Sequence, residues 1–437
     1  MKHACSLFNL AMGAACVVAM AAAPDMGAQA QGIKLESSFT KNKGAIPFAA
    51  LTPSGGQLFY GTTISNAANN YGGVYTFTSS TGAINLIDTF TSTNGSVPFA
   101  VLTPAGGGVY YGTTYSGGAQ DLGGVFAFNS STGAITLKDS FTGTNGASPY
   151  SALTPAGGNL FYGTTYEGGA DDLGGVFAFD SSTGLISLQA SFTGSNGANP
   201  LAGLTAGPGG VFYGTTGHGG ASGLGAVFAF NSATGEISLQ DSFNGANGDT
   251  PHAPLTAAGG DLYYGTTIFG GSDGFGTVYS FNRATGSITL KDSFTQSNGA
   301  TPYAALTPAE GGLFYGTTYA GGADNLGTVY AFNSLTGAIS LKDSFRGSNG
   351  ARPLAALTAG EGGLYYGTTT LGGVENLGAI YSFNPVPGPL PLMGVGAALG
   401  WSKRLRRRLR ACPGGAELAK NAGEEQGQRA RKGGGEP

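Results

Sequence analysis

Apolar and polar residues alternate along this chain in short segments that Gly-rich turns and loops separate. The alternation is clear between residues 297 and 345, where Lys and Ser occupy one face of the last segment. A period of two over six to eight residues is typical of half-buried β-strands, and the turn residues between segments favour hairpins. The pattern predicts four short strands, at residues 302–307 (PYAALT), 313–318 (LFYGTT), 326–333 (LGTVYAFN) and 338–345 (AISLKDSF).

This four-strand pattern recurs at one fixed interval. The tripeptide Gly-Thr-Thr follows an aromatic residue seven times, and its glycine advances by 51 residues at every step. A period of about 50 residues built from short strands is typical of a β-propeller. Residues 31–385 are therefore predicted to form an all-β, seven-bladed β-propeller with four-stranded blades. The seven glycines are Gly61, Gly112, Gly163, Gly214, Gly265, Gly316 and Gly367.

The order of strands in a blade and the closure of the ring can also be predicted. Residues 302–307 are short and apolar, which suits the innermost strand, and residues 338–345 carry charge, which suits an exposed edge. A strand of the outer type, 33–40, precedes the first copy, and none follows 379–384. We expect residues 33–40 to complete the seventh blade and close the ring.

Charge excludes two classes of partner. The whole chain has a net charge of −4, but residues 31–385 hold 9 Lys or Arg against 19 Asp or Glu, a net charge of −10. Such a body lacks the basic surface that binds nucleic acid or an anionic membrane. The three cysteines, Cys5, Cys16 and Cys412, lie outside the repeats, so no disulfide is expected in the body and export meets no pairing problem.

The N-terminal 30 residues have the features of a secretory signal peptide. Lys2 and His3 precede an apolar run, and Ala28-Gln29-Ala30 places small residues at a cleavage site after Ala30. Two alternatives stay open, namely a lipoprotein signal ending at Cys16 and a membrane anchor that is left uncut.

Residues 386–410 combine a Pro-rich hinge, a short apolar helix and an Arg cluster. This order of elements resembles the PEP-CTERM class of sorting signals, which implies an exosortase-type partner, transient membrane contact through 390–410 and display at the cell surface. The alternative is a simple stop-transfer anchor. Unlike that class, the chain continues past its basic cluster with a polar tail, 411–437, that is expected to be disordered.

The sequence motif of each copy consists of Tyr-Gly-Thr-Thr, then Gly-Gly, then Leu-Gly-x-Val-Tyr-x-Phe-Asn. This motif resembles the GloVer-type tandem repeat. The resemblance covers residues 33–384 and implies surface display without naming a reaction.

Two sets of loops should share one face of the propeller, and they hold the candidate ligand-binding residues. Exposed Tyr beside Asn and Asp could stack on a sugar and hydrogen-bond to it, whereas Gly and Asn are also ordinary residues of tight loops. Both interpretations stay open. The candidates are Tyr115, Tyr166, Tyr319, Asp171, Asp172 and Asp324, with Asp121 and Asp273 in related positions.

A second set of carboxylates repeats in the outermost strand of five copies, and Ser37 and Ala190 hold the position in the other two. Alternation puts Asp292 on the side of Leu290, which should be buried, so backbone N–H or hydroxyl groups should satisfy it. A structural role is favoured over calcium binding or catalysis. The residues are Asp88, Asp139, Asp241, Asp292 and Asp343.

Signals for catalysis are weak. His218 and His252 are the histidines of the body and neither recurs, the Gly270–Gly274 match to GxSxG lies in a loop, and Asp171-Asp172 is typical of a solvated turn. We expect no catalytic residue, metal or cofactor. The sequence favours an exported, non-enzymatic binding or matrix protein that recognises extracellular polysaccharide or a surface protein. A polysaccharide hydrolase or lyase and a purely structural coat protein are the alternatives.

Overall fold

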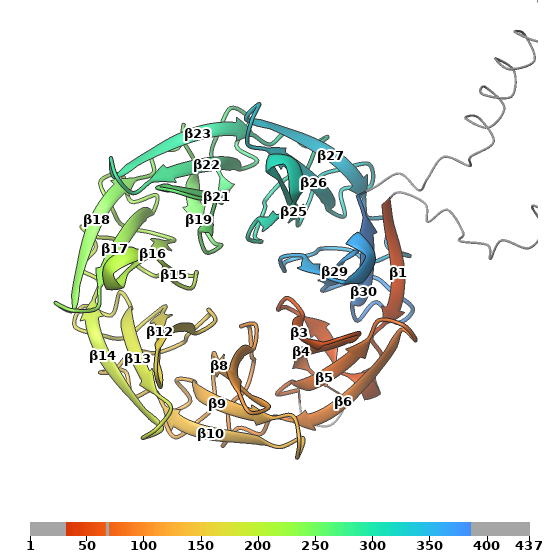
Figure 1. Cartoon of the computed structure of the whole chain (residues 1–437), viewed down its shortest axis with the longest axis horizontal. Coiled ribbons are helices and arrows are strands. Elements are labelled where there is room, and N and C mark those ends of the chain that lie inside the picture. Colours follow the sequence, from red (N-terminus) through yellow and green to blue (C-terminus); the bar gives the residue numbers. More distant parts are fainter. Residues whose placement is uncertain (1–31, 67–69, 386–437) are drawn as a thin grey trace, which may run out of the picture. The chain divides into compact units, whose positions relative to one another are not determined.

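The described part of the chain forms a ring of seven β-sheets. The computed structural model describes residues 32–66 and 70–385, and these make one compact unit around a central axis (Figure 1). This confirms the all-β, seven-bladed β-propeller that the repeat predicts. The expected signal peptide, sorting signal and tail, at 1–30, 386–410 and 411–437, lie outside the described residues.

Blades 1 to 4 follow one another in chain order, each with its strands running from the axis outwards. Their strands are β2 (Ala45–Pro47), β3 (Thr52–Gly55), β4 (Leu58–Ser65), β5 (Gly73–Thr78) and β6 (Ala83–Thr89); β7 (Thr103–Gly106), β8 (Val109–Thr114), β9 (Gly124–Asn129) and β10 (Ile135–Ser140); β11 (Thr154–Gly157), β12 (Leu160–Thr165), β13 (Gly175–Asp180) and β14 (Leu185–Ser191); and β15 (Thr205–Ala206), β16 (Val211–Thr216), β17 (Ala226–Asn231) and β18 (Glu236–Ser242).

Blades 5 to 7 continue in the same way, and the last blade takes its outer strand from the start of the described chain. Their strands are β19 (Asp249–Pro251), β20 (Thr256–Ala257), β21 (Leu262–Phe269), β22 (Thr277–Asn282) and β23 (Ser287–Ser293); β24 (Thr307–Pro308), β25 (Leu313–Thr318), β26 (Thr328–Asn333) and β27 (Ala338–Ser344); and β28 (Thr358–Ala359), β29 (Tyr365–Thr369), β30 (Ala379–Asn384) and β1 (Gly32–Ser38). Short 3-10 turns are η1 (Lys41–Lys43), η2 (Pro208–Gly210), η3 (Glu310–Gly312) and η4 (Glu361–Gly363).

Ring closure through the N-terminal strand is confirmed. Strand β1 pairs antiparallel with β30, with Gly32 opposite Asn384 and Ser38 opposite Ala379. The sheet order β1-β30-β29-β28 therefore joins the two ends of the repeat region in one blade. A closed ring removes the need for the terminal caps of an open solenoid.

The innermost strand is shorter than predicted. Residues 302–307 were expected to be a strand, but the structure has only Thr307–Pro308 as β24, and residues 302–306 are not strand. The seven equivalent segments converge on the axis, where no further strand lies inside them to pair with. Their main chain surrounds the channel instead, and the blade begins where Thr307 reaches its partner Tyr315 on β25.

The hydrophobic core is divided into seven similar layers, one between each pair of adjacent blades. Between blades 1 and 2, for example, Tyr60 packs against Tyr110 and Phe128 with ring centroids 5.1 Å apart in both cases. Between blades 7 and 1, Tyr366 packs against Phe59 at 5.4 Å. The closing interface thus buries the same kind of aromatic contact as the others, and such contacts stabilise the ring beyond simple area burial.

The Tyr-Gly-Thr-Thr sequence has a packing reason at each position. A Cβ on Gly61 would lie 2.4 Å from the ring of Tyr75, which crosses the strand at that point, so only glycine fits. The first Thr reaches across to the next blade, as Thr317 does when its hydroxyl donates to the Ala355 carbonyl at 3.1 Å. Thr368 does the same across the closing interface, to the Ala49 carbonyl at 3.1 Å.

A second threonine, at the start of each inner strand, links every blade to the next. Its hydroxyl donates to the carbonyl of a buried Leu in the following blade, so a hydrogen bond crosses all seven interfaces near the axis. The pairs are Thr52–Leu102 (2.9 Å), Thr103–Leu153 (2.8 Å), Thr154–Leu204 (2.6 Å), Thr205–Leu255 (2.6 Å), Thr256–Leu306 (2.9 Å), Thr307–Leu357 (2.8 Å) and Thr358–Leu51 (2.8 Å).

Candidate functional site

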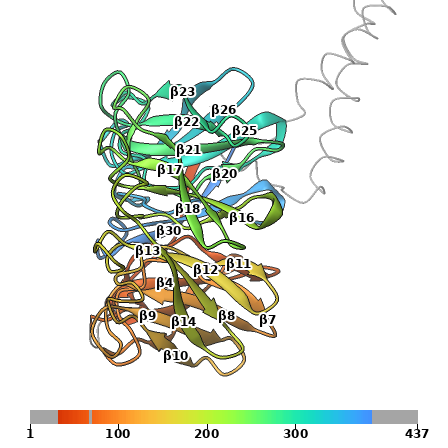
Figure 2. The ribbon, with the colours of Figure 1, turned by 90° about the vertical axis from the view of Figure 1, so that its left-hand side faces the viewer.

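The loops that carry the candidate residues do share one face of the ring. The loop that enters each blade pairs with the loop between that blade's second and third strands, as in the bridges Ala300–Ala320 and Ala351–Leu371. Figure 2 shows the ring edge-on, with many connecting loops gathered at one side. This face surrounds one mouth of the central channel, so its loops are placed to contact anything that enters.

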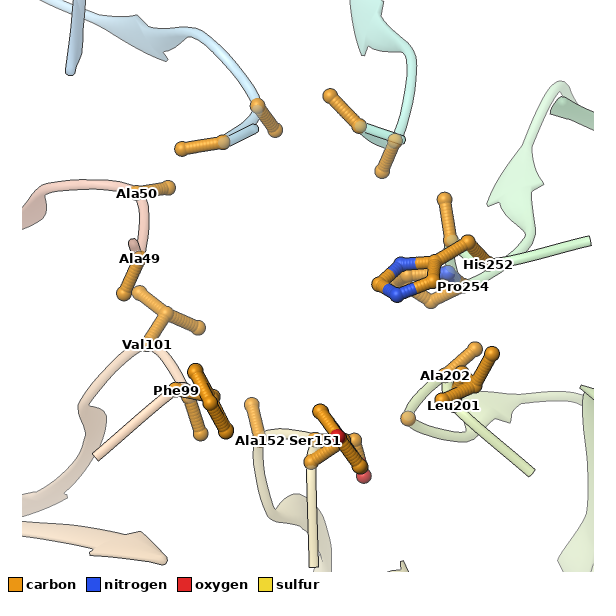
Figure 3. Close-up of a pocket in the computed structure, with 18 of the residues that line it drawn as sticks. Ala49, Ala50, Phe99, Val101, Ser151, Ala152, Leu201, Ala202, His252 and Pro254 are labelled. Carbon is orange, nitrogen blue, oxygen red and sulfur yellow. The ribbon is translucent and has the colours of Figure 1, made fainter. Parts of the chain in front are cut away.

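All seven blades line a cavity of about 210 Å³ on the axis. Each contributes a short segment that follows a proline, and small apolar residues such as Ala50, Ala152 and Pro254 form much of the wall (Figure 3). The first residue of each segment is half-buried and differs between blades. These seven channel-mouth residues are Phe48, Phe99, Tyr150, Leu201, His252, Tyr303 and Leu354.

The residue before each of these prolines has an unusual backbone. All seven adopt a positive φ without being glycine, and several are β-branched, for which this conformation is strained. A strained conformation of this kind persists only where the surrounding structure fixes the main chain. Here it precedes the turn that brings the residue after the proline to the channel mouth. The residues are Ile46 (φ 55°), Val97 (54°), Ser148 (52°), Asn199 (53°), Thr250 (52°), Thr301 (52°) and Arg352 (59°).

Five aromatic residues from blades 1 to 3 form a continuous group that we call the aromatic crescent, namely Phe48, Phe99, Tyr115, Tyr150 and Tyr166. Phe99 lies 4.6 Å from Phe48 and is stacked on Tyr150, with centroids 5.0 Å apart and planes 8° apart. Tyr150 also contacts Tyr115 at 4.9 Å and Tyr166 at 5.5 Å. Two of the predicted tyrosines are thus joined through one that the sequence analysis did not select.

The third predicted tyrosine belongs to a separate group on blades 5 to 7. Tyr319 contacts Tyr303 at 5.6 Å, and Tyr303 contacts the ring of His252 at 4.9 Å. The Arg352 guanidinium lies over the Tyr319 ring, 4.7 Å from its centroid, in a cation–π contact. Arg352 also donates to the Tyr319 carbonyl at 3.3 Å. Contacts with Arg352 of the neighbouring blade therefore occupy one face of the Tyr319 ring and its carbonyl.

Burial changes the acid–base behaviour of two channel-mouth residues. Loss of solvent raises the pKa of Tyr150 to about 12, with further contributions from Tyr115, Tyr166 and Glu167. Loss of solvent lowers the pKa of His252 to about 4, although the Tyr303 main chain opposes this in part. Both side chains are therefore neutral at physiological pH, and the imidazole points into the cavity (Figure 3).

None of the predicted loop aspartates lines the cavity. Asp121 and Asp172 take left-handed φ values of 59° and 58°, and their carboxylates accept from the N–H groups of Gly117 at 2.7 Å and Gly168 at 2.8 Å. They thus shape their own loops, as Asn or Asp does in tight turns. The remaining loop aspartates, Asp171, Asp273 and Asp324, are exposed.

The aspartates of the outer strands lie between blades. One carboxylate oxygen accepts from the next residue in the strand, and the other accepts from the N–H of an Ile in the outer strand of the following blade. Leu290, expected to be buried beside Asp292, is 38% exposed, because a register shift between Leu290 and Asp292 interrupts the alternation. The interblade pairs are Asp88–Ile135 (2.8 Å), Asp139–Ile186 (2.8 Å), Asp241–Ile288 (2.7 Å), Asp292–Ile339 (2.7 Å) and Asp343–Ile33 (2.8 Å).

Sequence reasoning overlooked the channel-mouth residues, although a signal for them exists. Seven nearly uniform copies differ at the position after the proline, which holds Phe, Tyr, Leu or His. His252 had been noted only as a histidine that does not recur, and His218 proves to be exposed on a loop. The Gly270–Gly274 segment lies in the loop between β21 and β22, as expected. No group of three or more His, Cys, Asp or Glu in the described ranges is arranged to hold a metal ion.

Comparison with protein families settles the relationship of the repeat. The profile of the Gloeobacter/Verrucomicrobia repeat matches residues 25–209 and 204–390, in tandem along the ring. The chain belongs to the Gloeobacter/Verrucomicrobia repeat family. This agrees with the GloVer-type resemblance of the Tyr-Gly-Thr-Thr copies. No curated protein matches the sequence of this Gloeobacter/Verrucomicrobia repeat protein.

Several solved structures share the fold of this family member. Two are extracellular domains of a B. thetaiotaomicron protein, described as a hybrid two-component system (TM-score 0.54, 9% identity, 80% of this chain and 39% of that chain) and as a one-component system (TM-score 0.55, 10% identity, 80% and 40%). The chain thus spans about 40% of their length. Another is assigned as a 6-phosphogluconolactonase from Bacteroides uniformis (TM-score 0.50, 15% identity, 78% and 94%). These identities establish a common fold and nothing further. Among the described residues, no helix is long and apolar enough to cross a membrane.

Proposed function

We propose that this Gloeobacter/Verrucomicrobia repeat protein is an exported, non-enzymatic binding protein that holds a neutral extracellular polysaccharide at the cell surface. The aromatic crescent carries the proposal, because Phe99 and Tyr150 present half-buried rings at the channel mouth, held there by contacts with Phe48, Tyr115 and Tyr166. Rigid aromatic faces bind the apolar faces of sugar rings with little loss of side-chain entropy, and tyrosine adds a hydroxyl for hydrogen bonding.

Charge supports a neutral ligand over an acidic one. The body carries a net charge of −10, from 9 Lys or Arg and 19 Asp or Glu. Glu167 borders the crescent, where its carboxylate lies 3.3 Å from the Ser148 hydroxyl. An anionic polysaccharide would meet repulsion from the whole body and from this carboxylate. A neutral chain meets none, and Glu167 and Ser148 can bind its hydroxyl groups.

Export and anchoring are part of the proposal and rest on sequence alone. The signal peptide predicted for 1–30 and the PEP-CTERM-like segment at 386–410 lie outside the described residues. Cell fractionation with intact mass measurement tests this route. A surface species that begins near Gln31 and ends near Pro387 supports handling by an exosortase. A membrane-bound species that still contains Arg410 contradicts it and favours a simple anchor.

Binding to a panel of neutral and anionic polysaccharides tests the function itself. We expect the neutral members to bind and Tyr150→Ala to weaken that binding by about tenfold or more, since a central aromatic contact contributes more than 1 kcal/mol. Leu185→Ala is the control, because this side chain is 61% exposed on β14, the outer strand of the same blade, away from the channel. Absence of binding across the panel would favour the coat-protein alternative. Depolymerisation that stops on changing Asp171 and Asp172 would favour the hydrolase or lyase alternative.

A further inference from the structure

The wall of the channel combines apolar side chains with polar main chain. The seven segments after the prolines, such as 48–51 and 303–306, lie between strands. In the described ranges, none of their N–H groups is the donor of a main-chain hydrogen bond in the turns and loops. Their alternate carbonyls accept threonine hydroxyls, as Ala304 does from Thr266 at 3.2 Å. Main-chain groups near an enclosed space need water or a ligand as partner, so the channel suits a molecule with both hydroxyl groups and apolar faces.

The dimensions of the channel limit what can enter it. Its volume of about 210 Å³ is below the roughly 300–1,000 Å³ of pockets for larger organic ligands. The channel therefore suits a small molecule, such as a single sugar unit. Since blades surround the axis on all sides, a polysaccharide lying across the face cannot enter along its length. Only a chain end can enter along the axis.

His252 distinguishes one side of this channel. Its imidazole faces the cavity, whereas the equivalent positions in blades 4 and 7 hold Leu201 and Leu354 (Figure 3). A neutral imidazole has one N–H donor and one acceptor nitrogen, and the Tyr303 main chain engages one of the two, which leaves the other to hydrogen-bond with a sugar hydroxyl. Tyr303 lies against the imidazole with ring centroids 4.9 Å apart and planes 80° apart, and this contact orients it. The other titratable residues at the wall are Tyr303, on blade 6, and Tyr150, on blade 3.

We propose that the channel receives one terminal sugar unit of the bound polysaccharide, and that His252 selects it by hydrogen bonding to its hydroxyl groups. This rests on the function proposed above and makes it more specific, because it assigns recognition of the chain end to the channel and contact with the following units to the aromatic crescent. The amount of protein that a polysaccharide sample binds would then depend on its number of chain ends and not on its total mass.

Methyl glycosides of neutral hexoses, pentoses and deoxyhexoses are suitable probes, with titration of the full chain followed by calorimetry and by ligand-observed NMR. We expect at least one glycoside to bind and to compete with the polysaccharide. Narrowing the channel by Ala152→Leu with Ala305→Leu should weaken glycoside binding by about tenfold or more. Val101 holds the same position in blade 2, so larger side chains fit there. Ala320→Leu is the matched control outside the channel, since Leu371 is its equivalent in blade 7.

His252 is tested by two substitutions with opposite expectations. His252→Leu copies blades 4 and 7 and should lower glycoside affinity by about tenfold, as expected for loss of a hydrogen bond to a buried ligand group. His252→Gln keeps a neutral donor and acceptor and should restore most of the affinity. Equal binding by the His252→Leu variant and the native chain would overturn the role of His252.

The outcomes separate this inference from the proposed function. If the polysaccharide binds the narrowed-channel variant as tightly as the native chain, and Tyr150→Ala still weakens binding, recognition of the chain end is wrong and the polysaccharide function stands. If neither glycosides nor polysaccharides bind the native chain, both fail. If a polysaccharide with chemically blocked ends binds less tightly in proportion to the blocking, the inference is supported.

Discussion

Both rims of this propeller repeat hydrogen bonds between blades, but only the inner rim also varies a residue that faces the channel. At the outer rim, five of seven interfaces repeat one hydrogen bond, from an Ile N–H to an Asp carboxylate of the preceding blade, at 2.7–2.8 Å. At the inner rim, the residue after each proline varies among Phe, Tyr, Leu and His. Repetition builds the framework, and variation at one position per blade gives the channel mouth its chemical character.

The largest expected effect comes from breaking the outer rim at its closing interface. Deletion of residues 31–40 removes strand β1, its pairing with β30 and the Asp343–Ile33 hydrogen bond. We expect a loss of stability on the order of 5 kcal/mol or more, since several hydrogen bonds and a buried layer are lost together. Thermal and urea unfolding of the full chain measure it. Lys34→Ala, whose side chain is 72% exposed, is the control and should cost less than about 0.5 kcal/mol. An unchanged melting temperature after the deletion would contradict closure.

At the inner rim, His252 should make stability depend on pH. Its pKa is lowered to about 4 in the folded chain, whereas an unfolded histidine titrates near 6.5. Between these values the unfolded state binds more protons, so stability is full above about pH 6.5 and falls as pH drops towards 4, by up to about 3 kcal/mol.

The variant His252→Leu removes this component, because it cannot titrate. The difference in unfolding free energy between the native chain and the variant, followed from pH 7 to pH 4, isolates it from the carboxylates that both share. A constant difference across that range would show that the imidazole keeps its ordinary pKa.

Single aspartates of the outer rim come next. Asp292→Ala leaves the Ile339 N–H without its acceptor and should cost on the order of 1–3 kcal/mol. Ala190→Asp tests the reverse, because Ala190 pairs with Val176 as Asp241 pairs with Val227. It should gain up to about 1 kcal/mol by supplying the missing acceptor. A change in ligand binding with no change in unfolding would show that Asp292 belongs to a site and not to the framework.

The smallest effect is expected from removing an unpaired hydroxyl in the third strands, between the two rims. The Tyr279 hydroxyl is buried and has no hydrogen-bond partner within the described part of the chain, and blade 4 has Phe228 at the equivalent position. Tyr279→Phe should therefore be neutral or stabilising by about 1 kcal/mol, and Phe228→Tyr should destabilise by about 1–3 kcal/mol. Unfolding measurements on both variants test whether the Tyr279 hydroxyl lacks a partner. A clear loss of stability in Tyr279→Phe would reveal a buried water that the hydroxyl binds.

Periodicity was sufficient to predict most of the framework. The fixed interval between the Gly-Thr-Thr copies gave seven blades, and the unpaired outer-type strand at 33–40 gave the closure that β1 and β30 make. The predicted strand 313–318 coincides with β25. Alternation failed for residues 302–306, whose apolar character reflects a channel wall and not a strand. It failed again at Leu290, which is exposed, because the register shift between Leu290 and Asp292 cannot be read from a pattern of period two.

The candidate site was only partly accessible from the sequence. Tyr115 and Tyr166 were selected because they lie in Gly-rich loops, and both belong to the crescent through their contacts with Tyr150. Tyr150 and His252 were missed, since each follows a proline in a segment that was interpreted as buried strand. The strained residues before those prolines, such as Thr250, turn the segment so that its first side chain reaches the mouth. Positive φ at a β-branched residue such as Thr250 is a feature of the folded chain, and it cannot be predicted from composition.

Closure also determines when the molecule can finish folding. The Asp343–Ile33 hydrogen bond joins residues 310 positions apart, and the Ser382–Glu36 bond joins residues 346 apart. Contacts of such separation form late, because a long loop of chain must be ordered before they are gained. Blades 1 to 6 can assemble one after another as the chain emerges, but the seventh lacks its edge strand until residues 379–384 return to the start. Until that moment β30 presents an unpaired edge, so the last step of folding is also the step most open to pairing with another chain.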